Sequence, residues 1–147
     1  MNLAELLDRT GLDALDHLER ELSVPVLDGL QAQGDLLVLP LAMLGTITVP
    51  TRARWHPVPP EGVELLRGAA GGNPHTLVSD RDTCRWSPAV HDPLGLTIAA
   101  FENTAPAFLV HPEHGGSGVA PGRWLVRRQQ ERGAARSSGP RRVLVAD

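Results

Sequence analysis

The sequence predicts a mainly β protein: a small antiparallel sandwich or barrel of about eight short strands, with one helix at the N-terminus. Short apolar or alternating runs recur from residue 35 onward, and turn residues separate them. The chain has 15 glycines and 13 prolines among 147 residues, which is above average usage and indicates many turns. No strand–helix–strand alternation and no repeat of fixed period is present, so the strand spacing favours a sandwich or a small barrel.

Residues 2–22 carry the pattern of an amphipathic helix. Leucines recur there at steps of three and four residues, with acids opposite them: Leu3, Leu6, Leu7, Leu12, Leu15, Leu18 and Leu22. Gly11 interrupts this stripe and could divide the helix. We therefore expect an N-terminal amphipathic helix within residues 1–23, packed on a β-rich domain of residues 24–147 rather than held in a partner's groove.

The remaining elements are expected to be strands joined by polar or glycine-rich turns. Residues 75–78 and 83–86 are interpreted as one hairpin, and residues 96–101 and 107–111 as another. Residues 50–62 hold four prolines and are expected to form an extended surface loop, with Trp55 folded back on the core. The other strands are expected at residues 36–39, 47–49, 63–67, 123–130 and 141–146.

Composition excludes several classes of protein. The single Cys84 rules out an intrachain disulfide and a multi-cysteine zinc site, and its strand context favours a buried apolar role over a nucleophile. No apolar run reaches the roughly eighteen residues that a membrane helix requires. The acidic start lacks a signal-peptide pattern, so a cytoplasmic protein that does not act at a membrane is expected.

The segment His111-Pro112-Glu113-His114-Gly115 is the first candidate site. Imidazole and carboxylate groups bind zinc, iron or manganese, so a divalent metal is the cofactor that this segment would suit. His111 and Glu113 would share one face of a continuing strand, whereas a tight turn at Pro112 would bring His111 and His114 together. His75 is the leading candidate for a third ligand, with His56 and His91 as further candidates.

Such a cluster at the mouth of a β-barrel would resemble the metal site of cupins, although this chain lacks their His-x-His pair. Two alternatives stay open. The rings of His111 and His114 could instead hydrogen-bond backbone groups within a tight polar turn, with Glu113 orienting one of them. The same histidine–glutamate pair could also act in acid–base catalysis, but no nucleophile or cofactor motif accompanies it.

The second candidate is a binding surface on the arginine-rich strand after residue 122. Residues 123–147 carry seven arginines against two acids, a charge of +5, whereas residues 1–122 carry −8. The candidate residues are Arg123, Arg127, Arg128, Gln129 and Glu131. Another protein is the favoured partner, and nucleic acid is a second class, disfavoured because Trp124 is the lone aromatic there and alternates with core positions. Homo-oligomerisation stays open.

Four segments resemble a family of small bacterial and phage-encoded proteins. They are Gln33-Gly34-Asp35, Gly71-Gly72-Asn73-Pro74-His75, the HPEHG segment, and the run from Pro121 to Glu131. The family carries a QGD start, a G-(N/H)-x-H turn, an HPEHG or HEEHG turn and a PG-x-Y-x-V-x-RQRE strand, and the resemblance covers about residues 24–147. It implies that His75, His111, Glu113 and His114 belong to a family pattern. It brings no activity, and this chain has Trp124 for the tyrosine and Gln130 for the second arginine.

The sequence therefore predicts a small cytoplasmic β-domain that acts as a non-enzymatic accessory or interaction protein. It would use the HPEHG turn and the arginine strand as its binding surface. The alternative is a metal-dependent, cupin-like enzyme with a His/Glu site, so whether the protein is an enzyme stays open.

Overall fold

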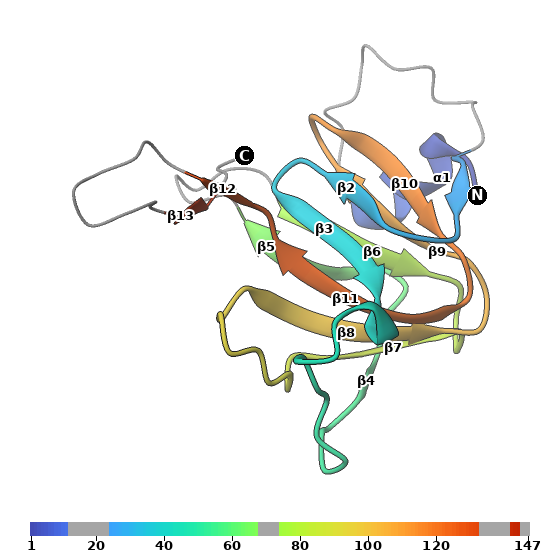
Figure 1. Ribbon diagram of the computed structural model, residues 1–147. Helices are drawn as coiled ribbons and strands as arrows, with labels where there is room; N and C mark the ends of the chain where they lie inside the picture. Colours follow the sequence, from blue (N-terminus) through green and yellow to red (C-terminus); the bar gives the residue numbers. More distant parts are fainter. Residues whose placement is uncertain (12–23, 68–73, 133–141, 145–147) are drawn as a thin grey trace.

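The computed structural model describes residues 1–11, 24–67, 74–132 and 142–144, and they form a mainly β fold. Eleven strands of the described residues make two facing sheets, with one short N-terminal helix, which confirms the predicted sandwich (Figure 1). In spatial order, the five-stranded sheet is β1 (Val26–Leu27), β10 (Gly115–Val119), β9 (Ala107–His111), β6 (Pro74–Ser79) and β5 (Val63–Arg67). The six-stranded sheet is β2 (Gln31–Gln33), β3 (Leu36–Pro40), β11 (Gly122–Arg128), β8 (Thr97–Asn103), β7 (Cys84–Ser87) and β4 (His56–Pro57).

The main core lies between these sheets. Leu77 and Leu109 of the five-stranded sheet face Val38, Phe101 and Trp124 of the six-stranded sheet, and all five are 2% exposed or less. Burying an aliphatic or aromatic side chain of this size stabilises the fold by about 1.5–3 kcal/mol. The Trp124 indole also donates to the Ala120 carbonyl oxygen at 3.0 Å, so its polar atom is satisfied inside the core.

A helix covers the outer face of the five-stranded sheet. Helix α1 (Leu3–Thr10) begins at Asn2, whose side chain accepts the Glu5 amide at 2.9 Å, and ends at Gly11 in the left-handed region. Fully buried Leu6 packs from α1 onto β6 and β9. Figure 1 shows α1 beside this sheet. The part of the helix expected over residues 12–23 lies outside the described residues. Within those residues, no helix is long and apolar enough to cross a membrane.

The outer face of the six-stranded sheet is covered by the chain that follows β3. The 3-10 turn η1 (Leu41–Met43) and the loop after it lay Ile47 over Leu39 and Leu125, and half-buried Trp55 packs against this cluster as predicted. The strand expected at residues 47–49 is wrong, since the structure has only an isolated bridge there between Thr48 and His91. The molecule therefore has a central sandwich with an extra layer on each side.

Both predicted hairpins are wrong in their pairing. β6 pairs with β5 and β9, whereas β7 pairs with β8 and β4, so the chain crosses from one sheet to the other between them. The β8–β9 connection makes the same crossing. The two crossings are tied together where the Thr104 amide donates to the Thr83 carbonyl at 2.8 Å. A short polar turn between two apolar runs fits an arch between sheets as well as a hairpin, and the sequence could not separate them.

The sequence did not predict β10 because this strand is made largely of glycine, and it did not predict the short strands β1, β2 and β4 either. β10 pairs with β9 on one side and runs parallel to β1 on the other, although its sequence GGSGV resembles a turn. A Cβ on Gly118 would lie 2.6 Å from the Pro25 carbonyl oxygen, so a side chain there would push β1 away. The glycines are needed for this close approach of backbone to backbone.

The strand expected at residues 123–130 is divided. β11 ends at Arg128, and the chain then forms a separate two-stranded sheet from β12 (Gln130–Arg132) and β13 (Arg142–Leu144). Two segments whose sequences suggest connections between strands, the small polar residues 133–140 and the glycine-rich residues 68–73, lie outside the described residues.

Candidate functional site

The candidate site lies at one end of the sandwich, where β6 begins, β9 ends and β2 turns into β3. We call it the histidine end and define it by Gln33, Asp35, His75, His111 and His114. His75 is fully buried on β6, with Nε2 at 2.9 Å from Asp35 Oδ1 and Nδ1 at 3.0 Å from Gln33 Oε1. These bonds join the two sheets, because His75 belongs to the five-stranded sheet and Gln33 to the six-stranded sheet.

The position of the protons on His75 follows from Gln33. The Gln33 amide nitrogen donates to the carbonyl oxygens of Leu109 at 3.0 Å and Gly115 at 3.2 Å. This fixes the Gln33 carbonyl oxygen toward His75, so His75 Nδ1 must carry a proton and donate it. His75 Nε2 faces the Asp35 carboxylate at 2.9 Å, and both groups are buried.

His111 closes the turn that follows β9. Its Nδ1 accepts the backbone amides of Glu113 at 3.0 Å and His114 at 3.2 Å. A nitrogen that accepts two N–H groups carries no proton, so His111 is neutral with its proton on Nε2. The ring is 1% exposed, and the HPEHG turn is therefore organised around a buried side-chain acceptor.

The three imidazole rings form one cluster, as the sequence led us to expect for these residues. The His111 centroid lies 4.4 Å from that of His75 and 4.5 Å from that of His114. His75 and His114 are 6.4 Å apart with nearly parallel planes. His75 and His111 are buried, whereas Glu113 and His114 are exposed on the turn. The structure thus separates the four predicted site residues into an inner and an outer pair.

The inner pair does not fit a metal site. A metal on either nitrogen of His75 would have to displace Gln33 or Asp35, and a metal on His111 Nε2 would require a proton on Nδ1, where two amides already donate. Among the described residues, no group of three or more histidine, cysteine, aspartate or glutamate side chains has an arrangement that could hold a metal ion. His56 lies against Trp86 on the six-stranded sheet, and His91 bridges Thr48, so neither joins the cluster.

The arginine strand does not form one surface. Arg123, at the start of β11, is 70% exposed beside Glu102, whereas Arg128 is exposed at the other end of the strand. The backbone amide of Gln129 donates to the backbone carbonyl oxygen of Asp35 at 2.7 Å, so the end of β11 near Arg128 adjoins the histidine end. Arg127 is 16% exposed and lies 3.4 Å from Asp92. The Glu131 side chain lies outside what the structure describes.

Asp92 holds Arg127 and also shapes the loop before β8. Burial raises the pKa of Asp92, but hydrogen bonds from the Thr97 side chain and from the Leu94 and Thr97 amides, together with the Arg127 charge, outweigh it and lower the pKa to about 2. For Cys84 the same effect of burial prevails: it raises the pKa of the thiol to about 12 despite a hydrogen bond with Ser79. Cys84 is thus a buried, protonated thiol, as expected.

Gln33 and Asp35 are site residues that were not predicted from the sequence. A signal was present, because Gln31 and Gln33 alternate along β2 and both are buried, although glutamine is usually exposed. Polar side chains at the inward positions of a short strand indicate a buried hydrogen-bond network. Here that network holds His75.

Comparison with known proteins identifies a family for this chain, but it identifies no activity. Neither a search of curated proteins nor a search of solved structures found a match to this chain. A family model described as "Domain of unknown function (DUF8820)" matches residues 32–129, from β2 to the residue after β11. The matched region is two thirds of the chain and includes the whole histidine end. The chain belongs to this uncharacterised family, DUF8820.

Proposed function

We propose that this protein is a cytoplasmic, non-enzymatic interaction protein that presents the HPEHG turn and the adjoining end of β11 to another protein. The observation that carries the proposal is the commitment of the buried histidines to the protein's own groups. His111 Nδ1 accepts two turn amides, and both nitrogens of His75 face Gln33 and Asp35. These buried hydrogen bonds thus hold the turn in one conformation.

A turn held in this way suits recognition. Glu113 and His114 are exposed on it, and Arg128 is exposed at the end of β11, beside the β2–β3 turn that carries Asp35. Because the backbone that carries this acid, imidazole and guanidinium is already held in place, little backbone conformational entropy is lost when a partner binds. These three side chains therefore make up the proposed contact surface, which we call the turn surface.

The metal-dependent alternative has less support, because its ligands would have to give up bonds that hold the turn. A direct comparison would measure zinc, iron and manganese in untagged protein and in a His111→Ala/His114→Ala double variant. Near-stoichiometric metal in the wild type that is lost in the folded double variant would replace the interaction proposal with the enzyme proposal.

We also infer that the four motifs quoted above are features of the family, and that its members occur in bacteria and phages. The family match supports the first part, because it contains the first three motifs entirely and the fourth as far as Gln129. An alignment of family members in which His75, His111 and His114 vary freely would contradict it.

The interaction proposal is tested by quantitative affinity enrichment from cells that encode the protein. The test variant is Glu113→Ala/His114→Ala/Arg128→Ala. The matched control is Glu61→Ala/His91→Ala/Arg81→Ala, which removes the same three side-chain types from exposed positions elsewhere. We expect proteins enriched by the wild type and the control to be lost with the test variant. Equal enrichment by all three chains would refute the turn surface.

A further inference from the structure

A second surface lies on the outer face of the six-stranded sheet, away from the turn surface. Its charged residues occupy three adjacent strands: Arg85 on β7, Glu102 on β8 and Arg123 on β11. The strand register sets Glu102 directly opposite both arginines. Because directly opposite residues on paired strands point to the same face, the three side chains form a row across the sheet.

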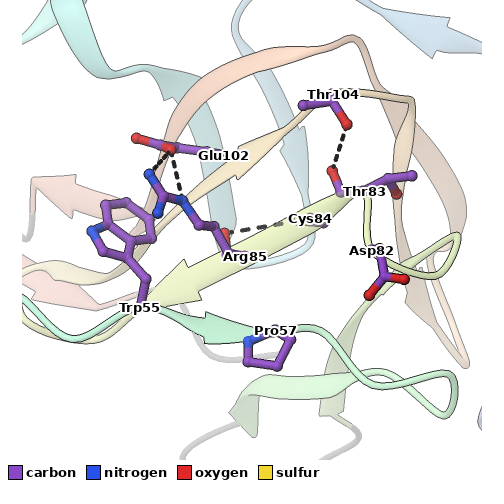
Figure 2. Close-up of a pocket in the computed structure, with 8 residues that line it drawn as sticks. All are labelled: Trp55, Pro57, Asp82, Thr83, Cys84, Arg85, Glu102 and Thr104. Atoms are coloured by element: carbon purple, nitrogen blue, oxygen red, sulfur yellow. Dashed lines mark hydrogen bonds and ion pairs between the residues drawn. The ribbon is translucent and has the colours of Figure 1, made fainter.

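The row is held by its own contacts and by Trp55. Arg85 donates from Nε at 2.9 Å and from Nη2 at 2.6 Å to Glu102 Oε2, and Arg123 Nε lies 3.3 Å from Glu102 Oε1. Figure 2 shows the Arg85 guanidinium beside the indole of Trp55, with its Cζ 4.8 Å from the ring centroid. We call these four residues the Trp55 surface. One carboxylate thus orients two arginines that are 54% and 70% exposed.

Two open hollows flank this row, and both are lined by Trp55 and Glu102. One has a volume of about 380 Å³ and includes Pro57 and Thr104 (Figure 2). The other has a volume of about 390 Å³, with an aliphatic wall that includes Ile47 and Val49 and with Arg123 at its charged side. The second hollow therefore offers apolar contact and a guanidinium side by side.

We propose that the Trp55 surface binds an acidic, extended peptide segment of a partner protein, with an aliphatic side chain against Ile47 and Val49 and a carboxylate on Arg123. The contact of Arg123 with Glu102 uses Nε, so the two Nη groups of this exposed side chain can bind a carboxylate in bidentate fashion. The proposal is independent of the turn surface, which lies at the opposite end of β11.

Charge complementarity favours an acidic partner. Glu102 balances only one of the two arginines that it contacts, and Asp82, in the first hollow, lies 3.9 Å from Arg81. Exposed Arg52 and Arg54 stand beside Thr51 and Trp55, which line the second hollow. The surface therefore carries a local excess of positive charge, although residues 1–122 are acidic as a whole.

A peptide fits better than the other ligand classes. Both hollows are open, whereas a small-molecule site encloses most of its ligand. For single-stranded nucleic acid, a free aromatic face is needed for base stacking, and Arg85 covers a face of Trp55. An extended chain can place alternate side chains in neighbouring hollows, as strand geometry requires.

The test is a selection of random linear peptides displayed on phage, using the whole protein as the target. The selected peptides are then measured against the wild type, Arg123→Gln and Arg9→Gln. The last variant is the control, since it removes a partly exposed arginine of helix α1 that belongs to neither proposed binding surface. We expect the peptides to combine acidic and aliphatic residues and to bind Arg123→Gln roughly tenfold more weakly, with Arg9→Gln unchanged.

Failure of the selection to enrich any peptide, or enrichment of peptides without acidic residues, would overturn the proposal. Equal loss in both variants would do the same, because it would indicate general charge attraction. A single-stranded oligothymidylate is measured in parallel. If it binds the wild type and loses affinity with Arg123→Gln, the surface is a nucleic-acid site and the peptide proposal is wrong.

Discussion

The histidine end and the Trp55 surface use similar groups in opposite surroundings. Each combines aromatic rings and a carboxylate. The carboxylate faces an imidazole at the histidine end and two guanidinium groups at the Trp55 surface. Asp35 and His75 are buried, whereas Arg85 and Arg123 are more than half exposed. Electrostatic interactions are strong in a desolvated site and weak in water, so a buried pair is costly to break and an exposed pair is easily exchanged for a ligand. Burial therefore separates a structural network from a surface suited to binding.

The largest expected difference in stability comes from removing one carboxylate from each region. Asp35→Ala removes the carboxylate that faces Nε2 of the buried His75, and we expect a loss of about 3–5 kcal/mol in the free energy of unfolding. Glu102→Ala removes a carboxylate from exposed arginines and should cost less than about 1 kcal/mol. Urea unfolding of both variants measures the contrast. Similar losses in the two variants would show that burial does not separate the regions.

Asp92 and Arg127 provide an intermediate case, because this pair is largely buried but lies near the surface. The pKa of Asp92 falls from 3.8 to about 2 on folding, so its stabilisation is present above about pH 4 and is lost as the pH falls toward 2. Asp92→Asn should therefore lower stability by about 2 kcal/mol at neutral pH and by much less at pH near 2. Urea unfolding across this pH range checks the prediction, which fails if both proteins show the same pH dependence.

A smaller effect on stability is expected at His111, whose buried Nδ1 accepts hydrogen bonds from two amides that lie close to water. His111→Phe keeps a ring in place but removes the acceptor for the Glu113 and His114 amides. Because both residues are exposed, water can replace the acceptor in part, and we expect a loss of about 1 kcal/mol. Amide hydrogen exchange should quicken at Glu113 and His114 while the β6 amides stay protected. Unchanged exchange at the turn would contradict the role given to His111.

The smallest effect on stability is expected at the Trp55 surface. Arg123→Gln removes a side chain that is 70% exposed, and its stability should stay within about 0.5 kcal/mol of the wild type. Its thermal unfolding midpoint, compared with that of Arg128→Gln, measures this. A marked loss of stability in Arg123→Gln alone would mean that the row on the sheet is structural, like the histidine end.

The sequence predicts strands well where apolar periodicity and turn residues agree. The strand at residues 63–67 coincides with β5, and the run at residues 36–39 lies within β3. The sequence predicts strands poorly where contacts between residues distant in the chain determine the pairing. Gly118 belongs to a strand because β9 and β1 pair with β10 on its two sides, and nothing near Gly118 in the sequence encodes the parallel pairing with β1. The pairing of β6 and β7 with different sheets likewise depends on distant strands.

The same limit applies to the candidate site. The sequence identified His75, His111, Glu113 and His114 as a group, and the three rings do come together. It could not identify which protons these rings carry, because that depends on Gln33, which is 42 residues from His75 in the sequence. Hydrogen-bond partners of a buried ring are set by tertiary structure, whereas the residue types alone suit both a metal site and a closed turn.

The crossings between sheets after β6 and β8 have a consequence for the order of folding. Because neither crossing forms a hairpin, only one edge of β6 and of β3 can pair early, with β5 and β2. The second edge of β6 must wait for β9, and that of β3 must wait for β11, which lies between β3 and β8 in the six-stranded sheet. Most of the sandwich therefore cannot close until residues 122–128 have left the ribosome. Such non-local pairing slows folding, and it leaves strand edges exposed on the nascent chain until β11 is inserted.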